Sequence, residues 1–345
     1  MTAKEIASLC GVSTATVSNI LNGKGKASEA TVKKVMEVIE ANDYKPNPIA
    51  RGLRTKVSKT IGVIAEDVAQ FTTPDILEGI MEECEKAGYR VMVENLRCYS
   101  RWGDKWYGEQ EELQKVIGLS MSDMRSVQVD GMIYIAGHAR EIRGFSEKLD
   151  IPNVVAYAYS YSQNSASVMI DDVKGGYDMT KYLLDKGHRK IAFIGGREDN
   201  LHTVRRLEGY QKALFEYKVL YNPELVSFGN WERPSGYDCM KKLEGTDFTA
   251  VFCINDQMCG GVYDYLSEKG LTAGKDISVT GFDDMIIASY FRPGLTTNAI
   301  NLKEIGRVSA KKLIEVFKTG KDFEEKVTYV PCKLVERESV TEINR

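Results

Sequence analysis

From residue 60 onward the chain alternates short apolar runs with amphipathic segments, and this alternation restricts its possible folds more than any other feature. The run TIGVIAE at 60–66 predicts a strand. The segment DILEGIMEECEKAG at 75–88 has apolar residues at helical spacing and ends at a glycine. Strands that alternate with helices form parallel sheets covered by helices on both faces. The sequence therefore predicts an α/β fold for this region.

The expected strands are too numerous for one comfortable sheet. We therefore expect two similar lobes, each a doubly wound parallel sheet, with the first set of strands ending at 153–157 and the second beginning at 167–170. The expected strands are 60–66, 89–95, 130–137, 153–157, 167–170, 190–196, 249–255 and 276–284. The expected helices are 75–88, 109–126, 173–186, 203–217, 234–244, 257–269 and 302–318.

The first sixty residues have a different pattern, in which two short helical segments flank a glycine turn. The first begins with the capping box Thr2–Glu5, and the second follows Gly11 with Ser13 as a suitable N-cap. Helices joined in this way form a helix-turn-helix, whose second helix enters the DNA major groove. A third helix over 28–41 would close the core. The expected core residues are Ile6, Ala7, Leu9, Val17, Ile20, Leu21, Val32, Val35, Met36 and Ile39.

A helical hairpin with no role in DNA binding would share much of this pattern. Two features favour a role in DNA binding. The exposed face of the second helix is small and polar, which suits hydrogen bonds to base edges and phosphates. Residues 1–59 also contain ten Lys/Arg and five Asp/Glu, a net charge of +5, and because the whole chain carries −3 the remainder carries −8. A basic head on an acidic body places the attraction for DNA at one end.

Composition excludes several classes of protein. The chain has no N-terminal apolar run typical of a signal peptide and no stretch near the ~20 apolar residues of a membrane span, so we expect a cytoplasmic protein without a membrane partner. The seven cysteines are scattered and form no CxxC pair, which indicates reduced thiols. The three histidines show no metal-ligand spacing, and we expect neither a metal nor a cofactor.

An α/β enzyme is the main alternative class. The segment IGGRED at 194–199 lacks the third glycine of a dinucleotide loop and the Lys-Ser/Thr of a P-loop, and the chain has no GxSxG motif. Asp171–Asp172 and Asp283–Asp284 are adjacent pairs, but neighbours on a strand point to opposite faces, so neither forms an acid/base couple. Nothing in the sequence calls for catalysis.

Ligands of doubly wound sheets bind at the carboxyl ends of the strands. In a protein with two lobes these ends face one another. The rule selects the loops at 67–73, 137–140, 157–161, 196–206, 229–232, 255–257 and 283–285.

The segment after the helical head resembles a known family. Tyr44-x-Pro46-Asn47-x-x-Ala50-Arg51-x-Leu53, which follows VSxxTVSxxLN, is similar to the lac and purine repressor family of bacterial transcription regulators. In that family this segment is a hinge helix that folds on the operator, and the resemblance gives Leu53 the role of a minor-groove wedge. Apolar wedges kink DNA at the expense of base stacking, which agrees with this role. A plain flexible linker is the alternative.

The resemblance covers essentially the whole chain and implies its organisation. It implies a helix-turn-helix domain over 1–46, a hinge over 47–59 and a periplasmic-binding-protein-like domain over 60–345. Three crossovers near 158–162, 290–295 and 321–327 would link the two lobes. Lobe 1 would then comprise about 60–160 and 293–322, and lobe 2 about 161–292 and 323–340.

The resemblance also implies the site residues. Arg206 and Asp283 match the residues that grip polar effectors in the relatives, and Trp231 matches an aromatic that stacks on the ligand. An arginine, a carboxylate and an aromatic platform suit a sugar or sugar derivative. The alternatives without a ligand are that Arg206 and Asp283 form an interlobe salt bridge and that Trp231 is a core residue. The expected effector-binding residues are Thr72, Thr73, Tyr157, His202, Arg206, Trp231, Asn255 and Asp283.

We expect a homodimer that binds a pseudo-palindromic operator, because one recognition helix reads only a few base pairs. Thr14, Ala15 and Asn19 would meet base edges. The other expected DNA-binding residues, on the phosphates or in the hinge, are Ser13, Thr16, Ser18, Asn22, Ala50, Leu53 and Arg54. We expect the chain to be a repressor, and a small-molecule effector between the lobes would change its operator affinity. We do not expect an enzyme. A cytoplasmic sugar-binding protein or an enzyme with an accessory helical domain are the alternatives.

One segment departs from the family average. LRCYSRWGDKWYGEQ at 96–110 is long and rich in aromatic residues, and loops of this length are commonly functional. Effector recognition and dimer packing are equally compatible with it.

Overall fold

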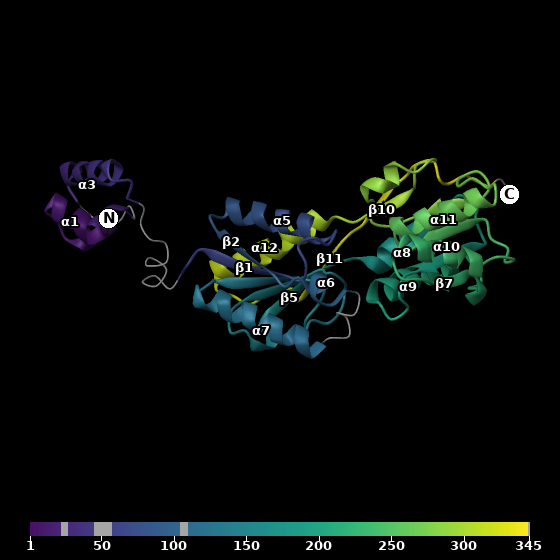
Figure 1. Cartoon of the computed structure of the whole chain (residues 1–345), viewed down its shortest axis with the longest axis horizontal. Coiled ribbons are helices and arrows are strands. Elements are labelled where there is room, and N and C mark those ends of the chain that lie inside the picture. Colours follow the sequence, from purple (N-terminus) through teal and green to yellow (C-terminus); the bar gives the residue numbers. More distant parts are fainter. Residues whose placement is uncertain (22–26, 45–56, 104–109, 344–345) are drawn as a thin grey trace. The chain divides into compact units, whose positions relative to one another are not determined.

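The computed structural model describes residues 1–21, 27–44, 57–103 and 110–343. The chain divides into two units, Met1–Lys59 and Thr60–Arg345 (Figure 1). The expected hinge residues Ala50, Leu53 and Arg54, and also Asn22, lie outside the described residues.

The first unit contains α1 (Ala3–Cys10), α2 (Thr14–Leu21) and α3 (Glu29–Ala41). The capping box forms as expected, since the Glu5 amide donates to Thr2 Oγ1 and the Thr2 amide to Glu5 Oε2. Gly11 ends α1 in the left-handed conformation at φ 68°, which a glycine adopts without strain. The turn between α1 and α2 is therefore encoded by one residue.

The core of this unit is smaller than the sequence predicts. It consists of Ile6, Ala7, Cys10, Val17, Val35 and Ile39, with Ile20 and Leu21 packed at its edge. Leu9, Val32 and Met36 were expected inside but are exposed, Leu9 by 57%. Leu9 lies about 110° around α1 from the centre of the buried face, and three short helices are too small to cover every apolar position.

The first sheet of the second unit is parallel, with the order β11-β5-β4-β3-β1-β2. Helices α5 (Thr73–Lys86) and α12 (Leu302–Thr319) cover one face, and α7 (Gln110–Ser126) covers the other (Figure 1). The strands are β1 (Thr60–Ala65), β2 (Arg90–Asn95), β3 (Gly131–Ile135), β4 (Asn153–Ala156), β5 (Ser165–Ile170) and β11 (Val327–Val330). The remaining elements of this lobe are α6 (Cys98–Trp102) and the short helix η2 (Ser146–Lys148).

The second sheet is also parallel, with the order β7-β6-β8-β9. Its strands are β6 (Ile191–Gly195), β7 (Val226–Phe228), β8 (Ala250–Cys253) and β9 (Ser278–Thr280). Its helices are α8 (Asp172–Asp185), α9 (Leu201–Glu216), α10 (Arg233–Lys242), α11 (Asp256–Glu268), η3 (Pro223–Leu225) and η4 (Ile286–Ser289). A small antiparallel pair, β10 (Thr297–Ala299) and β12 (Lys333–Val335), adjoins it.

The lobe boundary expected near 158–162 is wrong. Strand β5 was assigned to lobe 2, but it pairs with β4 and β11 in the first sheet. Parallel neighbours are usually joined through a helix, whereas the connection at 157–164 contains none, so the pattern suggested a new lobe there. The first crossing instead follows Ile170, at the start of α8.

The chain crosses between the lobes again after β10 and after β11. It leaves β10 for α12, which packs on α5 and the first sheet, and it leaves β11 for β12. The second and third crossings thus lie at about 300–301 and 331–332, close to but outside the expected ranges. Each lobe is therefore built from separate stretches of the chain.

Candidate functional site

A buried carboxylate organises the residues between the two lobes. Asp172 is the first residue of α8, directly after the crossing from β5. Its Oδ2 accepts a hydrogen bond from His202 Nδ1 at 2.8 Å, and its Oδ1 accepts one from Arg206 Nε at 2.8 Å. All three side chains are almost inaccessible to solvent. Burial alone would raise the pKa of Asp172, but His202 and Arg206 outweigh burial and lower that pKa.

Arg206 has partners on several sides. Its Nη1 donates to the Ile254 carbonyl at 2.5 Å and lies 3.7 Å from Asp283 Oδ1. Its guanidinium also lies 3.6 Å from the centre of the Phe282 ring. Burial disfavours the charged guanidinium, but Asp172 and Asp283 overcome this and raise the pKa of Arg206. The Arg206 guanidinium is thus held in the protein interior in its charged form.

The position of Arg206 depends on close helix packing. Its backbone on α9 lies against Gly176 of α8, where a Cβ atom would come within 2.3 Å of the Arg206 carbonyl oxygen. A larger residue at 176 would push the two helices apart. The glycine therefore sets the distance over which Arg206 reaches Asp172.

Asp283 differs electrostatically from Asp172. Its side chain is 6% exposed, and its backbone φ is 105°, in the region that favours glycine. Burial raises the pKa of Asp283 to about 7, with Arg206 opposing and Asp172 reinforcing the shift. The two carboxylates therefore share one arginine unequally. We call Tyr157, Asp172, His202, Arg206 and Asp283 the interlobe cluster.

The first lobe reaches this cluster through two of its strand ends. Tyr157 follows β4, and its ring centre lies 4.9 Å from that of His202. The backbone amide of Ala139, in the loop after β3, donates to His202 Nε2 at 3.1 Å. Tyr157 has φ 66°, so its backbone is held in an uncommon conformation beside the cluster.

Trp231 follows β7 and Asn255 follows β8, the two strands that flank β6 in the second lobe. Asn255 caps α11 by accepting from the Met258 amide at 2.9 Å, and its Nδ2 donates to the Trp231 carbonyl at 3.0 Å. The indole lies over Gly196, where a Cβ would be 2.7 Å from the ring, and 6.1 Å from the imidazole centre of His138 in the first lobe. Trp231 also has a positive φ of 79°.

Thr72 and Thr73 lie at the start of α5, and Gln70 connects them to the same region. The Thr73 amide donates to the Gln70 carbonyl, and the Gln70 side chain contacts His138. Both threonine hydroxyls and Trp231 Nε1 are buried and have no hydrogen-bond partner among the described residues. Unpaired buried polar atoms are unfavourable, and a polar ligand is one way to satisfy them.

The structure thus joins Tyr157 to His202 and Arg206 to Asp283, with Asp172 linking the two pairs, and it joins Trp231 to Asn255. Asn200 caps α9 by accepting from the His202 amide. The sequence missed Asp172, because the loop after 167–170 was not among the selected strand ends. An acidic residue at the start of a helix that follows a buried strand was the available signal. It also missed Asp256, whose carboxylate accepts from Thr297 Oγ1 and the Met285 amide and so supports the Asp283 loop.

Within the aromatic segment at 96–110, residues 104–109 lie outside the described residues. Trp102 of α6 packs, half-buried, against the hydrophobic cluster beneath α7, and Tyr99 is exposed. Tyr161 is also exposed, with its ring beside Tyr159. Of these aromatic residues, Trp102 is thus a packing residue of the first lobe. Trp106 and Tyr107 lie outside the described residues.

In the first unit, the expected DNA-binding residues lie along α2 and its N-terminus. Ser13 accepts from the Thr16 amide at 3.1 Å, so it caps the helix as predicted. The side chains of Ser13, Thr14, Ala15 and Asn19 are exposed, and those of Thr16 and Ser18 are half-buried. The face opposite Val17 is therefore open for contact.

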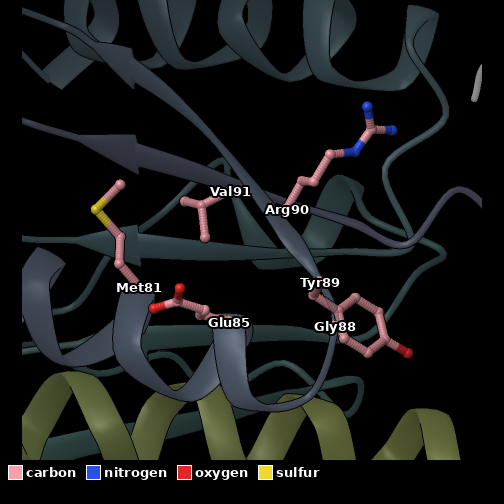
Figure 2. Close-up of a pocket in the computed structure, with 6 residues that line it drawn as sticks. All are labelled: Met81, Glu85, Gly88, Tyr89, Arg90 and Val91. Carbon is pink, nitrogen blue, oxygen red and sulfur yellow. The ribbon is translucent and has the colours of Figure 1, made fainter. Parts of the chain in front are cut away.

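A surface cavity of about 330 Å³ lies away from the interlobe cluster, between α5 and β2. Figure 2 shows Met81 and Glu85 of α5 on one side of it and Arg90 and Val91 of β2 on the other. Strand β2 is an edge of the first sheet, and Met81 and Val93 are 44% and 37% exposed. An edge strand beside exposed apolar side chains is open to pairing with another chain.

Within the described part of the chain, no group of His, Cys, Asp and Glu side chains is arranged to hold a metal ion. No helix among the described residues is both long and apolar enough to cross a membrane. All seven cysteines, each of which is described, carry free thiols.

Two family models match the chain. Residues 2–47 match the bacterial regulatory proteins of the lacI family, and residues 180–340 match a periplasmic binding protein-like domain. The repressor PurR of Vibrio atlanticus (strain LGP32) is 32% identical over 348 residues, covering 99% of both chains.

Two solved structures extend this likeness to the fold. The lac repressor dimer bound to operator and an anti-inducer is 25% identical with a TM-score of 0.80 and covers 99% of both chains. The transcriptional regulator CelR in complex with cellobiose is 26% identical with a TM-score of 0.66, covering 98% of this chain and 99% of that one.

Proposed function

Because the chain belongs to the lacI family of bacterial regulatory proteins and is a transcriptional repressor, we propose that a sugar or sugar derivative controls it from the interlobe cluster. The effector binds Arg206, Asp172 and Asp283 and changes the affinity of the first unit for a pseudo-palindromic operator. As a regulator of transcription, the protein acts on the DNA in the cytoplasm.

The buried pairing of Arg206 with Asp172 and Asp283 carries this proposal. A sugar presents several hydroxyl groups, each of which donates one hydrogen bond and accepts others. Carboxylates accept from such hydroxyls, and the guanidinium donates to them. The unpaired hydroxyls of Thr72 and Thr73 and the unpaired indole N–H of Trp231 add donors and acceptors of the same kind.

The similarity to CelR supports a saccharide over other small molecules, since that protein was solved with cellobiose. The aromatic face of Trp231 is the expected platform for a sugar ring.

The DNA-binding role is proposed for the exposed residues of α2, with Thr14, Ala15 and Asn19 at base edges. Ser13, Thr16, Ser18 and Asn22 are proposed to contact phosphates, and Ala50, Leu53 and Arg54 to contact the minor groove. The net charge of +5 on residues 1–59 supports this assignment. Two copies are needed for a pseudo-palindrome, and the edge strand β2 with Met81 and Val93 is the proposed dimer surface.

The test is a gel-shift with a library of palindromic duplexes, with and without a panel of sugars and sugar phosphates. We expect selective binding to one symmetric sequence, and a shift of that binding by one saccharide. Arg206→Gln should abolish the response to that saccharide. Arg205→Gln is the matched control, because Arg205 lies next to it in the chain but stacks outside the cluster, 5.6 Å from the Tyr329 ring. Absence of any preference for symmetric DNA, or equal responses of the two variants, would contradict the proposal.

A further inference from the structure

A single hydrogen bond ties the loop after β3 in the first lobe to α9 in the second. The Ala139 amide donates to His202 Nε2 at 3.1 Å, and both residues are 3% exposed. A backbone N–H can only donate, so Nε2 must be the accepting nitrogen of a neutral imidazole. The proton of that imidazole then resides on Nδ1, which donates to Asp172 Oδ2 at 2.8 Å.

The first-lobe end of this contact is held rigidly. The buried Glu66, at the end of β1, accepts from the Gly137 amide at 2.6 Å and from the Tyr134 hydroxyl at 2.7 Å. The same carboxylate forms an ion pair with Arg140. Glu66 therefore binds the residues on both sides of Ala139 and fixes the direction of its N–H.

The second-lobe end is held equally well. Asn200 Oδ1 accepts from the His202 amide at 2.9 Å, which sets the first turn of α9. Asp172 orients the imidazole through Nδ1, and the Tyr157 ring of the first lobe packs beside it. With both ends fixed, the bond can form only when the lobes are close together.

We propose that His202 acts as a clasp between the lobes. Its Nε2 holds the first lobe by accepting from the Ala139 amide, and its Nδ1 depends on Asp172 as hydrogen-bond acceptor. The clasp closes the lobes without an effector. Its regulatory role rests on the proposed function: an effector hydroxyl that donates to Asp172 competes with His202 for the same carboxylate. Effector binding and lobe closure are then linked through one imidazole.

Two substitutions test the roles of Nδ1 and Nε2 of His202 separately. In His202→Asn the amide nitrogen lies near the position of Nδ1 and can still donate to Asp172, but nothing reaches Ala139. In His202→Gln the amide oxygen lies near the position of Nε2 and can still accept from Ala139. His188→Asn is the matched control, because His188 contacts Thr249 and Thr341 within the second lobe.

The measurement is amide hydrogen exchange of the full-length, effector-free protein, read at the Ala139 amide. We expect exchange about two- to tenfold faster in His202→Asn, the range of one net hydrogen bond, and near wild-type rates in His202→Gln and His188→Asn. Amides of β8, such as Phe252, verify that each variant is folded. Wild-type exchange in His202→Asn, or equal acceleration in the Asn and Gln variants, would overturn the clasp.

A measurement on the unmodified protein keeps the proposal testable even if a variant fails to fold. The chain has three histidines, so their ring nitrogens can be resolved by NMR after 15N-histidine labelling. We expect His202 to be neutral with its proton on Nδ1, and a proton on Nε2 would refute the clasp. Neither experiment uses an effector. A failure of the sugar panel therefore contradicts the proposed function alone, and a failure here contradicts the clasp alone.

Discussion

Replacing Asp283 by Asn should stabilise the protein, and increasingly so as the pH rises. The side chain of Asp283 is 6% exposed and lies 3.7 Å from the guanidinium of Arg206, beyond hydrogen-bond distance. Burial raises its pKa to about 7 from an ordinary value of 3.8. The unfolded chain therefore loses this proton at lower pH than the folded one, and folding stability falls as the pH rises from about 4 to 7.

The size of the effect follows from the two pKa values. One pKa unit corresponds to about 1.4 kcal/mol. With a folded pKa of about 7, the ionisation of Asp283 lowers the free energy of unfolding by about 2 kcal/mol at pH 5 and about 4 kcal/mol at pH 8. Asn keeps the shape of the side chain and cannot ionise, so this penalty disappears. The advantage of Asp283→Asn should therefore grow by about 2 to 3 kcal/mol between pH 5 and pH 8.

Urea denaturation of both proteins at intervals from pH 5 to pH 8 measures the difference directly. Asp284→Asn is the matched control, because Asp284 is partly exposed and pairs with Arg337 at 2.7 Å. Loss of that pair should lower stability slightly. A difference between wild type and Asp283→Asn that stays constant with pH would refute the burial argument.

Three further outcomes follow from the structure. Thr72→Val removes a buried hydroxyl that lacks a partner, so thermal denaturation should show an effector-free protein about 1 kcal/mol more stable, with weaker effector binding by calorimetry. Thr180→Val is its control and should be destabilising, since that hydroxyl donates to the Gly176 carbonyl. Leu53→Ala should weaken operator binding in gel-shifts far more than nonspecific binding, and equal loss would contradict the wedge role. Met81→Glu should shift the protein toward monomer in sedimentation. Phe215→Glu is the control, because Phe215 near the end of α9 is 83% exposed, and it should leave the mass of the protein unchanged.

The sequence was most informative where local pattern and tertiary structure agree. Apolar runs such as 60–66 and 190–196 became buried parallel strands, because full burial on both faces requires a nearly continuous apolar sequence. The turn at Gly11 and the cap at Ser13 were also predictable, since both depend on one residue and its immediate neighbours.

The assignment of β5 failed because periodicity identifies a strand but says nothing about its neighbours. Ser165–Ile170 is buried throughout, as a central strand of either sheet would be. Its connection from β4 contains no helix, and only the hydrogen bonds to β4 and β11 place it in the first lobe.

The interlobe cluster was predictable except for Asp172. Tyr157, His202, Arg206 and Asp283 are expected site residues because the resemblance and the strand-end rule select them. Asp172 acquires its importance from His202 and Arg206, which lie 30 and 34 residues away in the chain. The clasp from Ala139 depends on a backbone amide, and no side-chain pattern signals such a group.

The repeated crossing between the lobes has a genetic consequence. A nonsense codon near residue 300 would leave β1 to β5 intact but remove α12 and β11, and with them part of the cover of one sheet face and one edge strand. The same truncation would take β12 from the other lobe. A truncation before α12 thus damages both lobes, whereas the helical head occupies one continuous stretch. Early-terminated alleles should therefore yield products that no longer respond to the effector.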